Sequence, residues 1–322
     1  MTDTRTINTL ESHDSEKTYT VGKIILNIAV VTLFAGTVIT LSFIKGKVST
    51  PKNTVYVAIM GLIWFYHTVR AVIKKNEYHP DIAVLIYSLF LIWDITFRIL
   101  GKGNPVLNPP MENVFEVFLK DSEFIAEGIG HSLMILVTGF SIALISGNIL
   151  GMIVGWVKRL NNDFTPIAKV LSPIPPMVYT PYLIALMPTF TSASIAVIGI
   201  GMFWPIFLGM INRVGSINGR LIDSAKAMNV STPTMLFKVI LPYSIPSIVG
   251  NLKIQISTIF MILIMAEMIG ATSGLGFFIK KYSDYADYAR VLAGIFVVGT
   301  AITILNVLLD IAEKKLIKWK PV

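Results

Sequence analysis

The chain has 322 residues, of which 54% are apolar and only 14% are charged, and its mean hydropathy is +0.70. A soluble domain carries roughly 25% charged residues, so the composition excludes an ordinary soluble enzyme and predicts an all-α protein that crosses the membrane several times. The absence of cysteine excludes disulfides and thiolate metal sites, and the net charge of +8 is better explained by cytoplasmic loops than by nucleic-acid binding.

Residues 1–21 form a polar stretch that mixes Thr, Ser, Asp and Glu. The stretch lacks the short basic region and apolar run of a cleavable signal peptide. We therefore expect a disordered cytoplasmic tail without a function of its own.

Apolar segments of about 20 residues, the length that a helix needs to cross a bilayer, recur along the rest of the chain. Eight such spans are predicted, at 22–44, 54–73, 81–100, 128–157, 166–187, 192–214, 246–268 and 289–310. An even number places both termini on one side. Lys and Arg are about twice as frequent in the segments on the side of the termini, so the positive-inside rule predicts that both termini are cytoplasmic and that the protein lies in the plasma membrane.

The first three spans form a separate block, 22–104. Asp94 and Arg98 are four residues apart in the third span and share a helix face. We interpret them as a structural pair near the outer surface, in preference to an ion or substrate contact, because an unpaired charge in lipid is costly.

Residues from 105 onward form a second domain, 105–322. It opens with a Gly- and Pro-rich loop, and a short amphipathic helix follows, with Glu112, Glu116 and Lys120 on its polar face. This pattern is typical of a helix that lies on the membrane surface, here the outer one.

The fourth span carries a ridge without side chains, formed by Gly147, Gly151 and Gly155 at intervals of four. Such ridges let helices approach closely in lipid. The sequence leaves open whether the partner helix belongs to the same subunit or to a second copy.

The fifth span contains three prolines within four residues, which break the helical hydrogen-bond ladder. Irregular backbone at membrane depth is tolerated where it is buried in protein or lines a wet cavity. We weigh a translocation pathway equally against a structural kink with tyrosines in an interface belt. The pathway candidates are Pro173, Pro175, Pro176, Tyr179, Thr180 and Tyr182.

The most polar run in the C-terminal half is the loop 216–245. Small residues follow Asp223, and Asn229 can adopt the left-handed conformation that ends a helix. Pro242 suits the first turn of the next helix. The loop thus predicts a short helix, a turn, a second short helix and a return into the membrane.

This loop resembles the coupling loop of ABC importer permeases, E-A-A-x3-G-x9-I-x-L-P. Every spacing is kept, although four of the seven positions carry a related residue. The positions that match are Asp223, Ser224, Ala225, Asn229, Val239, Leu241 and Pro242. In that family the loop is a cytoplasmic coupling helix; the plain alternative is an amphipathic connection between two spans.

The resemblance extends over residues 105–318, through NPPMENVFEVF, PIAKVLSPIPP and AEMIGATSGLG, to type I ABC importer permeases of the nitrate, sulfonate and taurine branch. It implies a type I permease core without catalytic residues or a bound cofactor or metal. Two separate ATPases would hold ATP and Mg²⁺, a second permease copy or paralogue would complete the pathway, and an extracytoplasmic binding protein would deliver a small organic or inorganic solute. The chain has no G-x4-G-K-[ST] motif, in agreement with an ATPase on another chain.

The competing class is an ATP-independent secondary transporter or channel, which requires carboxylates or histidine relays within the membrane. The spans offer only Asp94 and Glu267, both near the outer side. A purely structural membrane subunit is a third possibility. Lys253 is the one cation deep in a span of the second domain, and it can snorkel to the surface, so no preference for anions follows.

Overall fold

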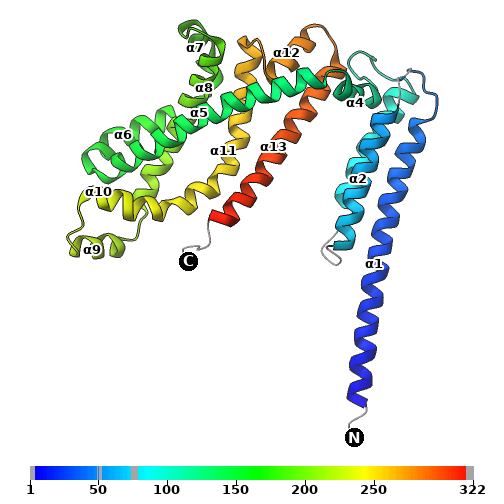
Figure 1. The fold of residues 1–322 in the computed structure, drawn as a ribbon, viewed down its shortest axis with the longest axis horizontal. Coiled ribbons are helices and arrows are strands. Elements are labelled where there is room, and N and C mark those ends of the chain that lie inside the picture. Colours follow the sequence, from blue (N-terminus) through cyan, green and yellow to red (C-terminus); the bar gives the residue numbers. More distant parts are fainter. Residues whose placement is uncertain (1–3, 49, 51–52, 74–78, 317–322) are drawn as a thin grey trace. The chain divides into compact units, whose positions relative to one another are not determined.

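The computed structural model describes residues 4–48, 50, 53–73 and 79–316, with backbone alone for residues 4–21. This part of the chain consists of helices joined by loops and contains no strand (Figure 1), as predicted. Its contacts group into two units. The first comprises Met1–Ser122 with Tyr285–Ala293, and the second Glu123–Asp284 with Gly294–Val322. Residues 105–122 thus lie with the N-terminal helices, whereas the sequence suggested a boundary at 104.

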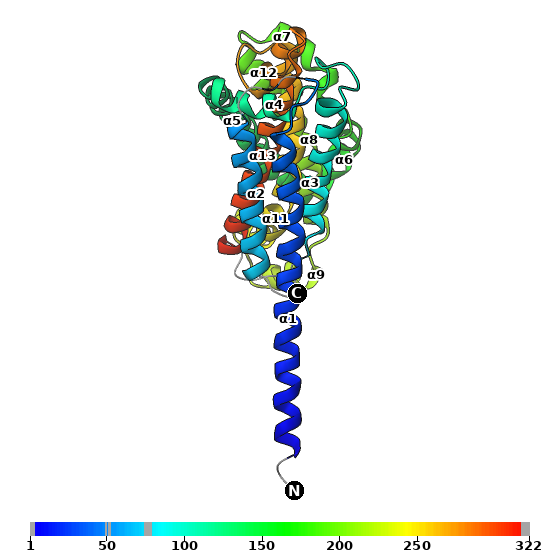
Figure 2. The same cartoon turned by 90° about the vertical axis from the view of Figure 1, so that its right-hand side faces the viewer.

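The first unit is built on three helices that lie side by side (Figure 2): α1 (Thr4–Ser42), α2 (Thr54–Ile73) and α3 (Asp81–Trp93). A π-helical turn, η2 (Asp94–Ile99), continues α3, and the short helix α4 (Met111–Lys120) contacts α2. The side chains of Tyr56, Tyr87 and Phe115 are buried at the centre of the unit, and the rings of Tyr56 and Phe115 lie 5.8 Å apart. Packing of aromatic residues thus holds α2, α3 and α4 together.

The predicted disorder of the N-terminal tail is wrong in the described part, because α1 begins at Thr4. No glycine or proline interrupts residues 4–21. A helix is costly to nucleate but cheap to extend, and here the apolar half of α1 provides the nucleus.

The second unit contains the remaining helices, apart from the start of α13 (288–293), which groups with the first unit. In chain order they are α5 (Ser122–Trp156), α6 (Lys158–Leu171), η3 (Pro176–Val178), α7 (Thr180–Leu186), α8 (Phe190–Gly215), α9 (Gly219–Ala227), α10 (Thr232–Thr234), the π-helix η4 (Met235–Ile240), α11 (Leu241–Gly270), α12 (Leu275–Asp284) and α13 (Tyr288–Leu316). Its main core joins α5, α8 and α11 through buried residues such as Ile135, Val197 and Leu263.

The glycine ridge of α5 lies against α8. A Cβ added at Gly151 would stand 2.6 Å from the carbonyl oxygen of Phe207, and one added at Gly147 would stand 2.9 Å from the side chain of Ile206. Gly155 meets Val214 in the same way. The backbones of α5 and α8 are therefore so close that side chains do not fit between them at these positions, and this packing lies within one subunit.

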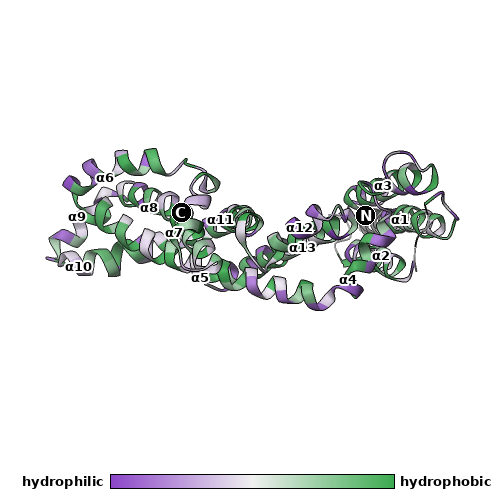
Figure 3. Cartoon of the chain, turned by 90° about the horizontal axis from the view of Figure 1, so that it is seen from above, coloured by the Kyte–Doolittle hydropathy of each residue, from purple (hydrophilic) through white to green (hydrophobic). Residues whose placement is uncertain are grey.

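Seven helices in the described part are long and apolar enough to cross a membrane, or eight if the bent pair Ile254–Gly270 and Leu275–Asp284 counts as one span. The number agrees with the prediction, but the segment 166–187 is not among them. The stretch Thr232–Leu252, which includes the end of the polar loop, takes its place. Hydrophobic residues predominate along the long helices (Figure 3). Many of their side chains are exposed, for example Leu33 and Leu62, each 66% exposed, as expected for contact with lipid.

Candidate functional site

The polar loop 216–245 folds as its sequence predicts. Asn218 begins α9, since its side-chain oxygen accepts a hydrogen bond from the amide of Arg220 at 3.0 Å. Asn229 ends the helix in the left-handed region, with φ of 53°. The amide of Asn229 donates to the carbonyl of Lys226, and the amide of Val230 donates to that of Ala225. These two bonds form a Schellman motif, which satisfies carbonyls at the end of α9.

One face of α9 is anchored in the protein. Ala225 is 8% exposed and lies in an apolar cluster with Met152 of α5, Met210 of α8 and Met235 of η4. Val230, the residue after the left-handed turn, packs against the same cluster. A small side chain at position 225 therefore lets the helix approach the ends of α5 and α8.

The opposite face of α9 is free within this chain. Asp223 and Ser224 are exposed, and so are two apolar side chains, Leu221 at 38% and Met228 at 78%. An exposed methionine beside a carboxylate and small residues is a surface suited to a protein partner.

The second half of the loop returns into the long helix α11. Val239 and Leu241 pack against the apolar cluster that holds Ala225, and Pro242 occupies the first turn of α11. The structure thus brings all seven residues of the motif into one loop: Ala225, Val239 and Leu241 face the protein, whereas Asp223, Ser224 and Asn229 are exposed. Between α10 and α11 the chain forms the wide turn η4, a geometry frequent at functional sites.

The segment 166–187 is broken into α6, η3 and α7, because prolines 173, 175 and 176 cannot donate hydrogen bonds. Both amides that would serve the carbonyl of Ser172, three and four residues on, belong to prolines. The break packs on α8 at Gly201, where an added Cβ would lie 2.6 Å from Pro176 and 3.0 Å from the hydroxyl of Tyr179. A discontinuous helix packed on a continuous one is an arrangement that transporters use at solute sites.

The three hydroxyl groups near this break have different surroundings. Thr180 is buried and donates to the carbonyl of Pro176 at 2.9 Å, so its hydroxyl serves the backbone. Tyr179 packs against the core, whereas Tyr182 is 69% exposed. Among the hydroxyls that the sequence suggested, that of Tyr182 is thus available to a solute or to lipid.

Glu267 holds the bend between α11 and α12, a role that the sequence did not suggest. Its two carboxyl oxygens accept hydrogen bonds from the hydroxyl of Ser132 and the amide of Gly276, each at 2.7 Å, and Ser132 in turn accepts from the amide of Leu275 at 2.9 Å. Gly274 has φ of 113°, and a Cβ there would lie 2.4 Å from the carboxylate. In the sequence, the short distance from Glu267 to Gly274 and Gly276 was the feature that could have indicated this bend.

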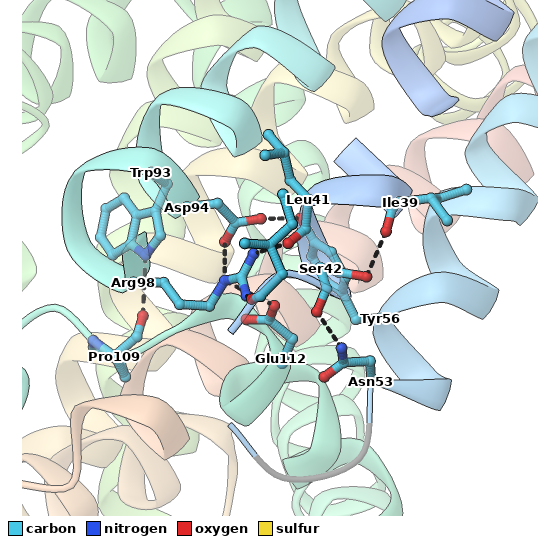
Figure 4. Close-up of polar contacts among 11 residues, drawn as sticks. Ile39, Leu41, Ser42, Asn53, Tyr56, Trp93, Asp94, Arg98, Pro109 and Glu112 are labelled. Atoms are coloured by element: carbon cyan, nitrogen blue, oxygen red, sulfur yellow. Dashed lines mark hydrogen bonds and ion pairs between the residues drawn. The ribbon is translucent and has the colours of Figure 1, made fainter. Parts of the chain in front are cut away.

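The Asp94–Arg98 pair has a third member that the sequence analysis assigned wrongly. Glu112 is 1% exposed and lies on Arg98, with 3.2 Å between Oε1 and Nε, closer than Asp94 at 4.0 Å (Figure 4). The prediction placed Glu112 on a solvated face with Glu116 and Lys120, of which only the latter two pair near the surface. The first turn of α4 faces η2 instead.

The described residues contain no group of three or more His, Cys, Asp or Glu side chains arranged to hold a metal ion. The side chain of Lys253 lies outside the described set.

Residues 147–318, more than half of the chain, match the family described as binding-protein-dependent transport system inner membrane component. Among curated proteins, the putative aliphatic sulfonates transport permease protein of Bacillus subtilis is 25% identical over 72% of this chain and 84% of its own length. The taurine transport system permease protein of Escherichia coli is 27% identical over 74% and 89%. The nitrate import permease protein of Synechococcus elongatus is 25% identical over 77% and 91%.

Among solved structures, a chain of the MetNI methionine ABC transporter in inward-facing conformations has the same fold. The match has a TM-score of 0.52 and 19% identity, and it covers 61% of this chain and 95% of that chain.

Proposed function

Because the chain belongs to the binding-protein-dependent transport system inner membrane component family, we propose that α9 is the coupling helix on which a separate ATPase docks. The protein is a multi-pass permease subunit of an ABC importer, in the nitrate, sulfonate and taurine branch, and has no catalytic activity of its own. The observation that carries the proposal is the two-sided character of α9: Ala225 is anchored in the core, while Asp223, Ser224 and Met228 are presented outward. A helix that transmits the movement of a partner needs one face packed firmly on its own subunit and another face exposed for the partner to bind.

Two adjacent positions test this geometry. Ser224→Leu adds bulk on the exposed face and is expected to abolish co-purification of the ATPase while leaving the permease as thermally stable as the wild type. Ala225→Leu adds the same bulk inside the cluster around Met152 and is expected to lower the stability of the permease itself, because overpacking of a core costs about 1–3 kcal/mol. If Ser224→Leu retained the ATPase, docking on this face would be excluded.

We propose that both termini and α9 are cytoplasmic, in line with the distribution of Lys and Arg. The chain has no cysteine, so single-cysteine variants can be labelled without background. Met228 and Tyr285 are 78% and 74% exposed. Met228→Cys is expected to react with an impermeant thiol reagent only in inside-out vesicles, and Tyr285→Cys only in right-side-out vesicles. The opposite pattern would invert the orientation.

We propose that the broken segment between α6 and α7 lines the solute pathway. Support comes from its three prolines, from the carbonyl of Ser172 without a local donor, and from its packing on Gly201 of α8. Tyr182→Phe is expected to change the apparent KM of transport, because it removes an exposed hydroxyl, whereas Tyr285→Phe, the matched control, is expected to leave KM unchanged. Equal effects of the two variants would remove Tyr182 from the pathway.

The partners that the family implies are an ATPase and a binding protein. We propose two ATPase subunits carrying ATP and Mg²⁺, a second copy or paralogue of this permease, and an extracytoplasmic binding protein that delivers a small organic or inorganic solute. The relatives are named for nitrate, taurine and aliphatic sulfonates, so small oxyanions are the first solutes to test. Uptake into vesicles that requires internal ATP and the binding protein supports this assembly, and uptake driven by a proton gradient alone contradicts it.

The geometry does not favour a secondary transporter. Glu267, a carboxylate buried within the second unit, where a proton relay would need one, has its two oxygens bonded to Ser132 and Gly276. These hydrogen bonds give the buried carboxylate of Glu267 a structural role at the bend between α11 and α12.

A further inference from the structure

Three ionisable side chains meet in the buried centre of the first unit, outside the segment that matches the family. Asp94 is fully buried, and Arg98 and Glu112 are each 1% exposed. They come from η2 and α4, and the hydroxyl of Tyr56 on α2 joins them (Figure 4). Two carboxyl groups thus share one guanidinium in a place that water does not reach.

Most of the hydrogen-bonding capacity of Arg98 is directed elsewhere. Its Nη1 donates to the carbonyl of Ile44 at 2.9 Å, and its Nη2 donates to that of Leu41. Only Nε faces the carboxyl groups, at 3.2 Å from Glu112 and 4.0 Å from Asp94. One N–H group therefore lies between two acids, and it forms a well-aligned hydrogen bond with neither.

The two acids differ in what else they contact. Asp94 accepts a hydrogen bond from the hydroxyl of Tyr56 at 2.8 Å, so one of its carboxyl oxygens has a donor. Neither carboxyl oxygen of Glu112 forms a well-aligned hydrogen bond, and one oxygen of Asp94 also lacks one. With both acids ionised the cluster would bury a net negative charge and three oxygens without a well-aligned hydrogen bond, a combination that is strongly unfavourable in a protein interior.

We propose that this cluster is a proton-binding site, in which Glu112 holds one proton at neutral pH and Asp94 remains the ionised partner of Arg98. The added proton cancels the net charge and gives Glu112 a donor of its own. No metal ion is needed to balance the cluster, because the guanidinium of Arg98 already occupies the position between the carboxyl groups.

The electrostatic surroundings of Glu112 agree with this assignment. Burial, followed by the nearby charge of Asp94, raises the pKa of Glu112 to about 7, although its own backbone amide and Arg98 act in the opposite direction. The charged and titratable groups that face it are Tyr56 from α2 and Asp94 and Arg98 from η2; further along α4, Glu116 pairs with Lys120. The end of α1 contributes carbonyl groups alone to the contacts with Arg98.

Proton binding links the packing of α4 to pH. The pKa of Glu112 in the folded protein lies above its ordinary value of 4.5, so the folded unit binds the proton more tightly than the unfolded chain does. Its contribution to stability is complete below the ordinary value and is lost as the pH rises through about 7. In the orientation proposed above, η2 and α4 lie at the external side of the membrane.

Infrared spectroscopy of the full chain in lipid nanodiscs tests the proposal, because a protonated carboxyl group has a carbonyl stretching band that a carboxylate lacks. We expect the difference spectrum of the wild type minus Glu112→Gln to show a carboxyl band at pH 6, which disappears as the pH is raised through about 7. Glu116→Gln, one turn along the same helix, is the matched control and should keep the band. Asp94→Asn should also lose it at neutral pH, since Glu112 then has Arg98 to itself and ionises.

Thermal unfolding provides a second measurement. The contribution of Glu112 to the stability of the wild type is expected to fall between about pH 4.5 and pH 7 and to level off above that range, whereas Glu112→Gln, which mimics the protonated acid, is expected to lack this fall. The absence of a titrating carboxyl band from the difference spectrum of the wild type minus Glu112→Gln overturns the proposal, and so does a stability of Glu112→Gln that falls with pH as steeply as that of the wild type. Neither result bears on the docking of the ATPase, which is measured separately.

Discussion

The left-handed residue that ends α9 gives a quantitative test of the proposed coupling helix. Asn229 has φ of 53°, a conformation that costs an ordinary L-residue about 1–2 kcal/mol and glycine nothing. Asn229→Gly should therefore stabilise the turn slightly. Asn229→Val, with a branched Cβ in the same conformation, should destabilise it by about 2 kcal/mol. Because a tenfold change in affinity corresponds to about 1.4 kcal/mol, the valine variant is expected to bind the ATPase at least tenfold more weakly.

The assay is titration of the purified ATPase against the permease in nanodiscs, with ATP hydrolysis as a second readout. The two hydrogen bonds of the Schellman motif, to the carbonyls of Lys226 and Ala225, must form for α9 to hold its position. Thr232→Val, in the same loop but in a helical conformation, adds a similar side chain without strain and should bind normally. If Asn229→Val bound as tightly as Asn229→Gly, the rigid turn would have no part in docking.

Three further predictions concern packing and buried polar groups. Gly151→Val should lower thermal stability by about 1–3 kcal/mol, because its Cβ would collide with the carbonyl of Phe207, whereas Gly130→Val on the same helix, where nothing lies within 4 Å, should be tolerated. Glu267→Gln keeps the shape of the side chain but replaces one acceptor by a donor, so it should cost about 1–3 kcal/mol and leave the bend before α12 more accessible to proteases; wild-type protease resistance would contradict that role. Arg98→Lys should destabilise the first unit, measured by thermal unfolding, since one ammonium does not reproduce the planar fork that serves two carbonyls and two acids; unchanged stability would show that the fork is dispensable.

Local chemistry made the polar loop predictable. The ability of Asn229 to adopt positive φ and the preference of Pro242 for a first helical turn depend on the residue itself, and both appear in the structure. The direction in which each side chain points was not available from the motif. Only the positions of Met152 and Met210 show that Ala225 faces inward and Ser224 outward.

Long-range contacts account for what the sequence did not show. The pattern of α4 groups Glu112 with Glu116 and Lys120, but the residue that faces Glu112 is Arg98, on a different element. In the same way, nothing in the sequence near Glu267 indicates that Ser132, far away on α5, will donate to it. The segment 166–187 has the length of a span and was predicted as one. Its prolines, which are visible in the sequence, break it into α6, η3 and α7 instead.

The length of α5 has a mechanical consequence. At about 1.5 Å per residue, the 20 residues between Ser132 and Met152 correspond to about 30 Å, the thickness of the hydrocarbon layer. No break interrupts α5 between these two residues. One continuous helix therefore connects Ser132, which binds Glu267 at the bend between α11 and α12, to Met152, which packs in the same apolar cluster as Ala225. A movement of α9 that displaces the Met152 end of α5 would therefore also displace its Ser132 end, because no loop lies between them.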